Sequence, residues 1–73
     1  PRYLLPGAAR EDFSPAALDI LRLQSEGMTA TQIGAKLGMK PDTVRYHIKE
    51  NYRKLEAGGK VEAIAAARRL GLI

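Results

Sequence analysis

The side chains with the most chemistry to offer lie in one short segment, Thr43-Val44-Arg45-Tyr46-His47-Ile48-Lys49. Arginine and lysine can donate hydrogen bonds to the O6 and N7 atoms of guanine, whereas a tyrosine offers a hydroxyl group and a ring edge to a thymine methyl group or a phosphate. On a helix, Arg45, Tyr46 and Lys49 would share one face. The segment therefore predicts a helical surface that contacts the bases and phosphates of a nucleic acid.

The opposite face of the same helix is apolar, with one polar member. It is formed by residues spaced four, three and four apart, namely Val44, Ile48, Asn51 and Leu55. A helix with an apolar back and a basic front can pack on the body of a domain and still lie in a major groove. A buried amide without a partner would cost about 1–3 kcal/mol. We therefore expect Asn51 to find a hydrogen-bond partner or to reach the edge of the domain.

Four further polar side chains are candidates for contacts with the phosphate backbone: Thr29, Thr43, Arg53 and Lys54. Thr43 is near the start of the predicted helix, where a hydroxyl group and backbone N–H groups can bind a phosphate together. Arg53 and Lys54 lie farther along the helix and would meet phosphates. Any one of these basic residues alone would be an ordinary solvated side chain, and only their common arc behind a tight turn favours nucleic acid.

The elements that must position these residues are predicted to be helices. The hydrophobic spacing gives an all-α fold of four helices, over about residues 15–26, 30–37, 41–56 and 60–70, with no strand. Ser14 is a favoured N-cap for the first helix, and Thr29 with Gln32 forms a capping box for the second. Leu18, Leu21 and Ser25 follow the helical spacing expected of an inward face.

Only Gly38-Met39-Lys40 separates the second and third predicted helices. A turn of this length containing glycine is typical of a helix-turn-helix unit. Gly34 lies inside the second helix, where glycine costs about 1 kcal/mol relative to alanine. This favours a close helix–helix crossing at Gly34 that excludes a larger side chain, although simple drift between alanine and glycine is the alternative.

Charge and length are consistent with a small nucleic-acid-binding domain. The chain has 73 residues, enough for one small core, and a net charge of +4. All of this excess lies in residues 40–73, because acidic and basic residues balance in residues 1–39. A basic half suits a polyanionic partner. The alternative is that an excess of four is the ordinary charge that keeps a small domain soluble.

Several other classes of protein are disfavoured. There is no cysteine, which excludes disulfides and thiolate metal sites and fits a reducing cytoplasm. The longest apolar run, Ala63 to Ala67, is far short of the ~20 residues that span a bilayer. His47 is the only histidine, so a metal site would need carboxylates alone beside it, and we expect a packing role instead. No catalytic or phosphate-loop pattern is present, and we expect no enzyme activity, metal or cofactor.

From about Phe13 to Ile73 the chain resembles the LuxR-type (GerE-type) helix-turn-helix domain of bacterial transcription regulators. The matching segments include Phe13-Ser14-Pro15, Gly27-Met28-Thr29, Gln32-Ile33-Gly34, Leu37-Gly38-Met39, Thr43-Val44-Arg45-Tyr46-His47 and Tyr52-Arg53-Lys54-Leu55. The resemblance implies a four-helix DNA-binding output domain. It also implies that Arg45, Tyr46 and Lys49 contact bases.

The same resemblance implies that the fourth helix serves dimerisation. The spare face of this helix would then carry the contacts, through Val61, Ile64, Ala65 and Arg68. Two departures from the family pattern concern the third helix. Lys40 replaces a capping serine and is a poor N-cap near a positive helix end, and Asn51 replaces an apolar residue.

We therefore expect residues 1–12 to be a linker or N-terminal arm and residues 13–73 to be the DNA-binding domain. Because the chain begins at proline without a recognisable signal peptide, a larger cytoplasmic parent protein with an N-terminal sensor or regulatory domain is expected. Two alternatives remain open. One is a sigma-factor-like promoter-binding domain that acts with a polymerase, and the other is a helix-turn-helix fold used for protein–protein interaction.

Overall fold

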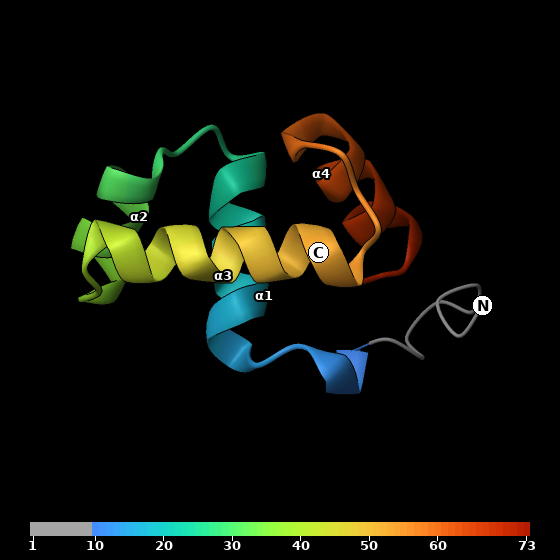
Figure 1. The fold of residues 1–73 in the computed structure, drawn as a ribbon, viewed down its shortest axis with the longest axis horizontal. Coiled ribbons are helices and arrows are strands. Elements are labelled where there is room, and N and C mark those ends of the chain that lie inside the picture. Colours follow the sequence, from blue (N-terminus) through green and yellow to red (C-terminus); the bar gives the residue numbers. More distant parts are fainter. Residues whose placement is uncertain (1–9) are drawn as a thin grey trace.

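The computed structural model describes residues 10–73, so most of the predicted arm lies outside the described residues. Over residues 10–73 the fold is all-α, as predicted, with no strand (Figure 1). A short 3-10 helix is followed by four α-helices: η2 (Arg10–Asp12), α1 (Pro15–Ser25), α2 (Ala30–Leu37), α3 (Pro41–Lys54) and α4 (Lys60–Arg69). No helix within residues 10–73 has the length and apolar character needed to cross a membrane.

The predicted helix starts are confirmed, and three of the predicted ends are too late. Helices α1 and α4 each end one residue early, whereas α3 ends at Lys54 instead of Glu56. The cause at α3 is Glu56, whose φ of 54° places it in the left-handed region. The chain therefore leaves the helical path two residues before the predicted end.

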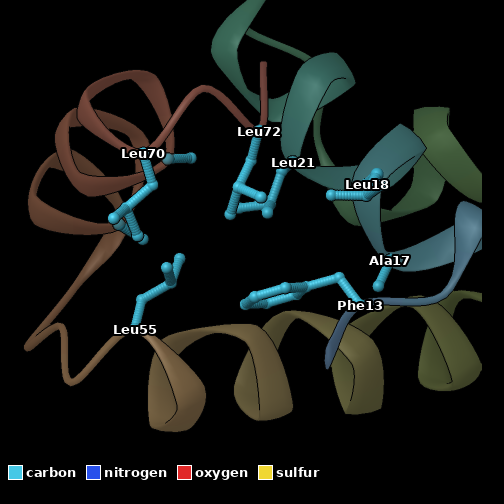
Figure 2. Close-up of a cluster of buried hydrophobic side chains, with 9 residues drawn as sticks. Phe13, Ala17, Leu18, Leu21, Leu55, Leu70 and Leu72 are labelled. Carbon is cyan, nitrogen blue, oxygen red and sulfur yellow. The ribbon is translucent and has the colours of Figure 1, made fainter. Parts of the chain in front are cut away.

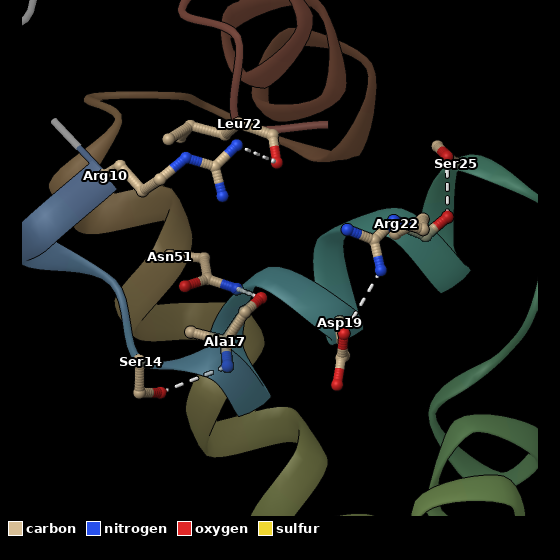
Figure 3. Close-up of polar contacts among 8 residues, drawn as sticks. All are labelled: Arg10, Ser14, Ala17, Asp19, Arg22, Ser25, Asn51 and Leu72. Carbon is tan, nitrogen blue, oxygen red and sulfur yellow. Dashed lines mark hydrogen bonds and ion pairs between the residues drawn. The ribbon is translucent and has the colours of Figure 1, made fainter. Parts of the chain in front are cut away.

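Side-chain caps fix the starts of α1 and α2. The Ser14 hydroxyl accepts a hydrogen bond from the Ala17 amide at 3.1 Å (Figure 3). The Thr29 hydroxyl accepts from the Gln32 amide at 3.2 Å, while the Gln32 side chain accepts from the Thr29 amide at 2.9 Å. These bonds satisfy backbone donors that the first turn of a helix leaves free. The start of α3 has no such bond, because Lys40 makes no side-chain cap.

The turn between α2 and α3 is held tightly against Gly34. The carbonyl group of Gly34 accepts hydrogen bonds from the amides of Gly38 and of Met39, the latter at 2.9 Å. A Cβ atom added at Gly34 would lie 2.5 Å from the carbonyl oxygen of Met39. The predicted close approach is therefore confirmed, but its partner is the backbone of the turn instead of a crossing helix.

Helix α1 lies behind α3 and is packed between two apolar clusters (Figure 1). The larger cluster joins α1 to α4 and to the C-terminal residues, and it contains Phe13, Ala17, Leu18, Leu21, Leu55, Ala63, Ala67, Leu70 and Leu72 (Figure 2). The smaller cluster joins α1 to α2 and to the first turns of α3 through Ile20, Leu23, Ile33 and Val44. Burial of these side chains is the main force that holds α3 on the body.

Asn51 is the polar link between α3 and α1. Its side chain is 1% exposed, and its Nδ2 atom donates a hydrogen bond to the Ala17 carbonyl oxygen at 3.2 Å (Figure 3). The expectation that this amide would find a partner is confirmed. The expected inward position of Ser25 is wrong, because Gln24 is the buried residue and its Nε2 atom donates to the Tyr52 hydroxyl at 3.1 Å.

Two basic side chains tie the first described residues to the domain. The Nη2 atom of Arg10 donates to the Gly71 carbonyl oxygen at 2.8 Å and also lies 3.5 Å from that of Leu72 (Figure 3). The Nζ atom of Lys54 donates to the Asp12 carbonyl oxygen at 2.8 Å. The last three residues of the predicted arm thus contact both the C-terminal residues and the end of α3.

Candidate nucleic-acid interface

Helix α3 presents one face to the body and the other to solvent. Val44 and Asn51 are buried, with Leu55 buried just past the helix end, and Ile48 is half-buried. In Figure 1 the helix crosses in front of α1, with α2 beside its N-terminal half and α4 beside its C-terminal end. A second partner can therefore approach α3 along its whole outer face.

The outer face carries the three residues predicted to contact bases. Arg45, Tyr46 and Lys49 are all exposed. Tyr46 is 63% exposed and is one of two large hydrophobic side chains that lie exposed within residues 10–73, the other being Val61. Its ring meets the ring of His47 edge-on, with the centroids 5.9 Å apart. The aromatic surface of Tyr46 adds nothing to the core and is available to a partner.

His47 is half-buried beside Tyr46, between the two faces of α3. The packing role expected for His47 from the sequence stays a prediction. Within residues 10–73 there is no group of three or more His, Cys, Asp or Glu side chains placed to hold a metal ion.

Both arginines of α3 are paired with an acidic residue three positions earlier. Arg45 Nη1 lies 2.8 Å from Asp42 Oδ1, and Arg53 Nη2 lies 2.9 Å from Glu50 Oε1. The hydrogen bond from Arg53 lowers the pKa of Glu50, so this carboxylate stays charged to a lower pH than an unpaired glutamate. Exposed pairs of this kind contribute little to stability. Their main effect is to orient the two guanidinium groups along the outer face.

The four candidates for contacts with the DNA backbone differ in exposure and in the contacts that they make within the domain. Thr43 is exposed in the first turn of α3, and Thr29 is exposed at the start of α2, where its oxygen serves as a cap and its hydroxyl proton can still be donated. Arg53 is exposed, whereas Lys54 is half-buried. The Lys54 ammonium donates to Asp12 and lies 5.3 Å from the centroid of the Phe13 ring.

This structural role of Lys54 was not predicted from the sequence. No local pattern indicates it, because the contact joins residues 42 positions apart and exists only after the N-terminal residues pack on α3. A basic residue at the end of a helix is favourable to the helix dipole in any case. Lys54 therefore supports the fold in addition to any contact with a ligand.

Helix α4 has the two faces predicted from its sequence. Ala63 and Ala67 are buried in the larger cluster. On the other face Val61 is 83% exposed, with Ala65 and Arg68 exposed nearby and Ile64 half-buried. One face of the helix thus closes the core, and the other remains uncovered.

Residues 11–67 match the model of a protein family described as "Bacterial regulatory proteins, luxR family". The chain belongs to this family. The match covers η2 in part, all of α1 to α3 and most of α4. The resemblance inferred from the sequence is therefore confirmed, and luxR-family membership makes the chain the DNA-binding output domain of a bacterial transcription regulator.

Individual relatives agree with the family assignment. The chain is similar to "Transcriptional activator protein PhzR" of Pseudomonas fluorescens, with 39% identity over 62 residues, which is 85% of this chain and 25% of the relative. It is 38% identical over 64 residues to "HTH-type quorum sensing-dependent transcriptional regulator RpaR" of Rhodopseudomonas palustris, covering 88% of this chain and 26% of the relative. "Regulatory protein SdiA" of Escherichia coli is 34% identical over 62 residues, with coverages of 85% and 26%. The chain thus spans about a quarter of the length of these luxR-family relatives.

Proposed function

We propose that this domain binds specific double-stranded DNA sequences by placing α3 in the major groove. The observation that carries the proposal is the contrast between the two faces of α3. Arg45, Tyr46 and Lys49 are exposed, while the opposite face is buried against α1 and α2. A helix held in this way after a tight turn has the geometry of a recognition helix.

The exposed side chains have complementary roles in this proposal. Arg45 and Lys49 donate to guanine O6 and N7, and Tyr46 contacts a thymine methyl group or a phosphate. Contacts with the DNA backbone come from Thr29, Thr43, Arg53 and Lys54, which fix orientation without conferring sequence preference. An ammonium group has three donors, so the side chain at position 54 can bond a phosphate and keep its contact with Asp12.

Dimerisation through α4 extends the proposal to two half-sites. The supporting observation is the uncovered face formed by Val61, Ile64, Ala65 and Arg68. A two-fold pair would present two α3 helices about 34 Å apart, one turn of DNA. Val61→Glu should abolish assembly without unfolding the domain, because the Val61 side chain is already in water. Sedimentation of the domain on a DNA fragment with two half-sites tests this, and an unchanged two-to-one complex in the variant would refute it.

The remaining proposal concerns the rest of the protein. Because the chain spans about a quarter of the luxR-family relatives, we assign it to a longer cytoplasmic regulator whose other part is an N-terminal sensor or regulatory domain. In that protein the domain binds DNA and catalyses no reaction. Expression of the full-length protein with and without its input signal, followed by DNA-binding measurements, tests the connection.

The direct experiment is selection of binding sites from random DNA, followed by affinity measurements at several salt concentrations. Each phosphate contact should contribute about −0.9 to the slope of log affinity against log salt. Arg45→Ala and Lys49→Ala should each cost about 1–3 kcal/mol and relax one base position, whereas Arg53→Ala should weaken all sequences alike.

Three outcomes would contradict these assignments. Equal and sequence-independent losses for all three variants would refute the base contacts. Absence of salt-dependent DNA binding would favour a protein–protein interaction module instead. Binding that requires added RNA polymerase would favour the sigma-factor-like alternative.

A further inference from the structure

We propose that Asp42 is a specificity-determining residue, whose carboxylate selects a cytosine next to the guanine contacted by Arg45. This inference rests on the proposed function, since it requires α3 to lie in the major groove. It adds to the base-contacting set a residue of the opposite charge. No role for this acidic side chain was predicted from the sequence.

The geometry places the two charged groups in contact on the outer face. Asp42 is the second residue of α3, and Arg45 lies one turn later. Oδ1 of the carboxylate accepts from Nη1 of the guanidinium at 2.8 Å, while the carboxylate side chain remains 95% exposed and that of Arg45 58% exposed. The N-terminal residues of a recognition helix are the ones that contact base edges. Asp42 therefore enters the groove together with Arg45.

The hydrogen-bonding capacity of the pair determines what it can contact. A guanidinium group has five N–H donors, so the bond to Asp42 leaves Arg45 enough donors for both O6 and N7 of a guanine. An ionised carboxylate can only accept. Cytosine presents its N4 amino donor to the major groove, whereas guanine and thymine present oxygen acceptors at the same level. Adenine has an amino donor but also an N7 acceptor, which would face the second carboxylate oxygen.

The carboxylate thus attracts one base edge and repels the others. Repulsion matters for specificity because a binding site is defined as much by the sequences it rejects as by those it accepts. The bond to Oδ1 also restricts the rotation of the Arg45 side chain. The guanidinium is then presented to the groove in one orientation, and the two selected bases are neighbours.

Another ion pair in the domain allows a purely structural role of Asp42 to be tested. Asp19 and Arg22 on α1 form a pair with the same spacing, 3.2 Å between Oδ1 and Nη1 (Figure 3). The side chains of both pairs are about half exposed or more, and neither pair belongs to the core. If the acidic residue only supported its helix, Asp42→Ala and Asp19→Ala would have the same small effect. Asp19→Ala is therefore the matched control for charge and for loss of an ion pair.

The experiment is site selection from random double-stranded DNA with the wild-type domain, Asp42→Ala, Asp42→Asn and Asp19→Ala at one salt concentration. In Asp42→Ala, preference for cytosine at one position should fall about tenfold or more, while affinity for random DNA rises because one negative charge is gone. In Asp42→Asn the preferred base at that position should become adenine, which matches a side-chain amide at N6 and N7. Asp19→Ala should retain the wild-type sequence. Thermal unfolding of each variant confirms that it is folded.

Failure of this inference is distinguishable from failure of the proposed function. If the wild-type domain selects no sequence, the proposed function fails and the inference fails with it. If the wild-type domain selects a sequence and Asp42→Ala selects the same one with unchanged base preferences, only the role of Asp42 is refuted. Loss of the same base preference in Asp19→Ala would also refute it, because the effect would then follow from charge alone.

Discussion

Replacement of Asn51 by aspartate should make the domain less stable as the pH rises from acidic to neutral. Asn51 is almost fully buried, and its side-chain N–H donates to the carbonyl oxygen of Ala17. In Asn51→Asp the protonated carboxyl group still has one donor for this oxygen, and its shape is close to that of the amide. The ionised form has no donor and places a negative charge against a carbonyl oxygen.

The magnitude follows from proton linkage. Burial and the facing oxygen atom both raise the pKa of the introduced carboxyl group above its value in the unfolded chain. The folded state then holds its proton to a higher pH than the unfolded state does. Below the pKa of this carboxyl group in the unfolded chain, the variant keeps its highest free energy of unfolding relative to wild type. Above that pH, the free energy of unfolding falls by about 1.4 kcal/mol per pH unit until the pH reaches the pKa in the folded state. Between about pH 4 and pH 7 the variant should lose up to about 4 kcal/mol.

Urea unfolding followed by circular dichroism, measured for wild type and variant at each pH, gives the difference directly. Because a small domain has a stability of only about 5 kcal/mol, the variant should approach unfolding at neutral pH and refold on acidification. Asn51→Leu is the control, since it introduces no charge and leaves Ala17 with its helical partner; its difference from wild type should not vary with pH. A pH-independent loss in Asn51→Asp would refute the buried hydrogen bond.

Three further predictions concern the turn before α3 and the residues at its C-terminal end. Gly34→Ala should lower the free energy of unfolding by about 1 kcal/mol in urea titrations, because the clash of its Cβ atom with the turn outweighs the gain in helix propensity; a gain like the one expected from propensity alone would contradict this. Lys54→Met should cost about 1 kcal/mol in the same assay, because the bond from the Lys54 ammonium group to Asp12 joins α3 to another segment; an unchanged free energy of unfolding would argue against this anchor. Glu56→Gly should raise the thermal midpoint, with a gain of about 0.5–1 kcal/mol, since glycine adopts the left-handed conformation without strain; a lower midpoint would be the contrary result.

The parts of the fold that the sequence predicted are those encoded within a few residues. Ser14, Thr29 with Gln32, and Gly38 act through hydrogen bonds or backbone conformations that span one helical turn. Their residue types are therefore sufficient to mark where helices start and stop. The end of α3 was misplaced because no local residue type marks it. A glutamate in the left-handed region, as at position 56, has no sequence signature of its own.

The parts that could not be predicted depend on contacts between distant segments. Gln24 is buried because the hydroxyl group of Tyr52, 28 positions later, accepts its hydrogen bond. Helical periodicity contains no information about that partner and favoured Ser25 instead. The candidate site shows the same division. The exposed face with Arg45 and Lys49 follows from helical spacing, whereas the ion pair between Arg45 and Asp42 depends on the rotamers chosen in the fold.

The anchors of α3 matter because the outer face is set by the rotation of one helix. Successive residues of an α-helix differ by about 100° in direction, so a rotation by one residue would turn Arg45 and Lys49 toward the body. Contacts at three points oppose such a rotation: the turn at Gly34, the hydrogen bond from Asn51 to α1, and the bond from Lys54 to the N-terminal residues. Apolar packing alone constrains rotation less, since hydrophobic contacts are not directional. The two directional bonds and the closed turn therefore determine which side chains α3 presents on its outer face.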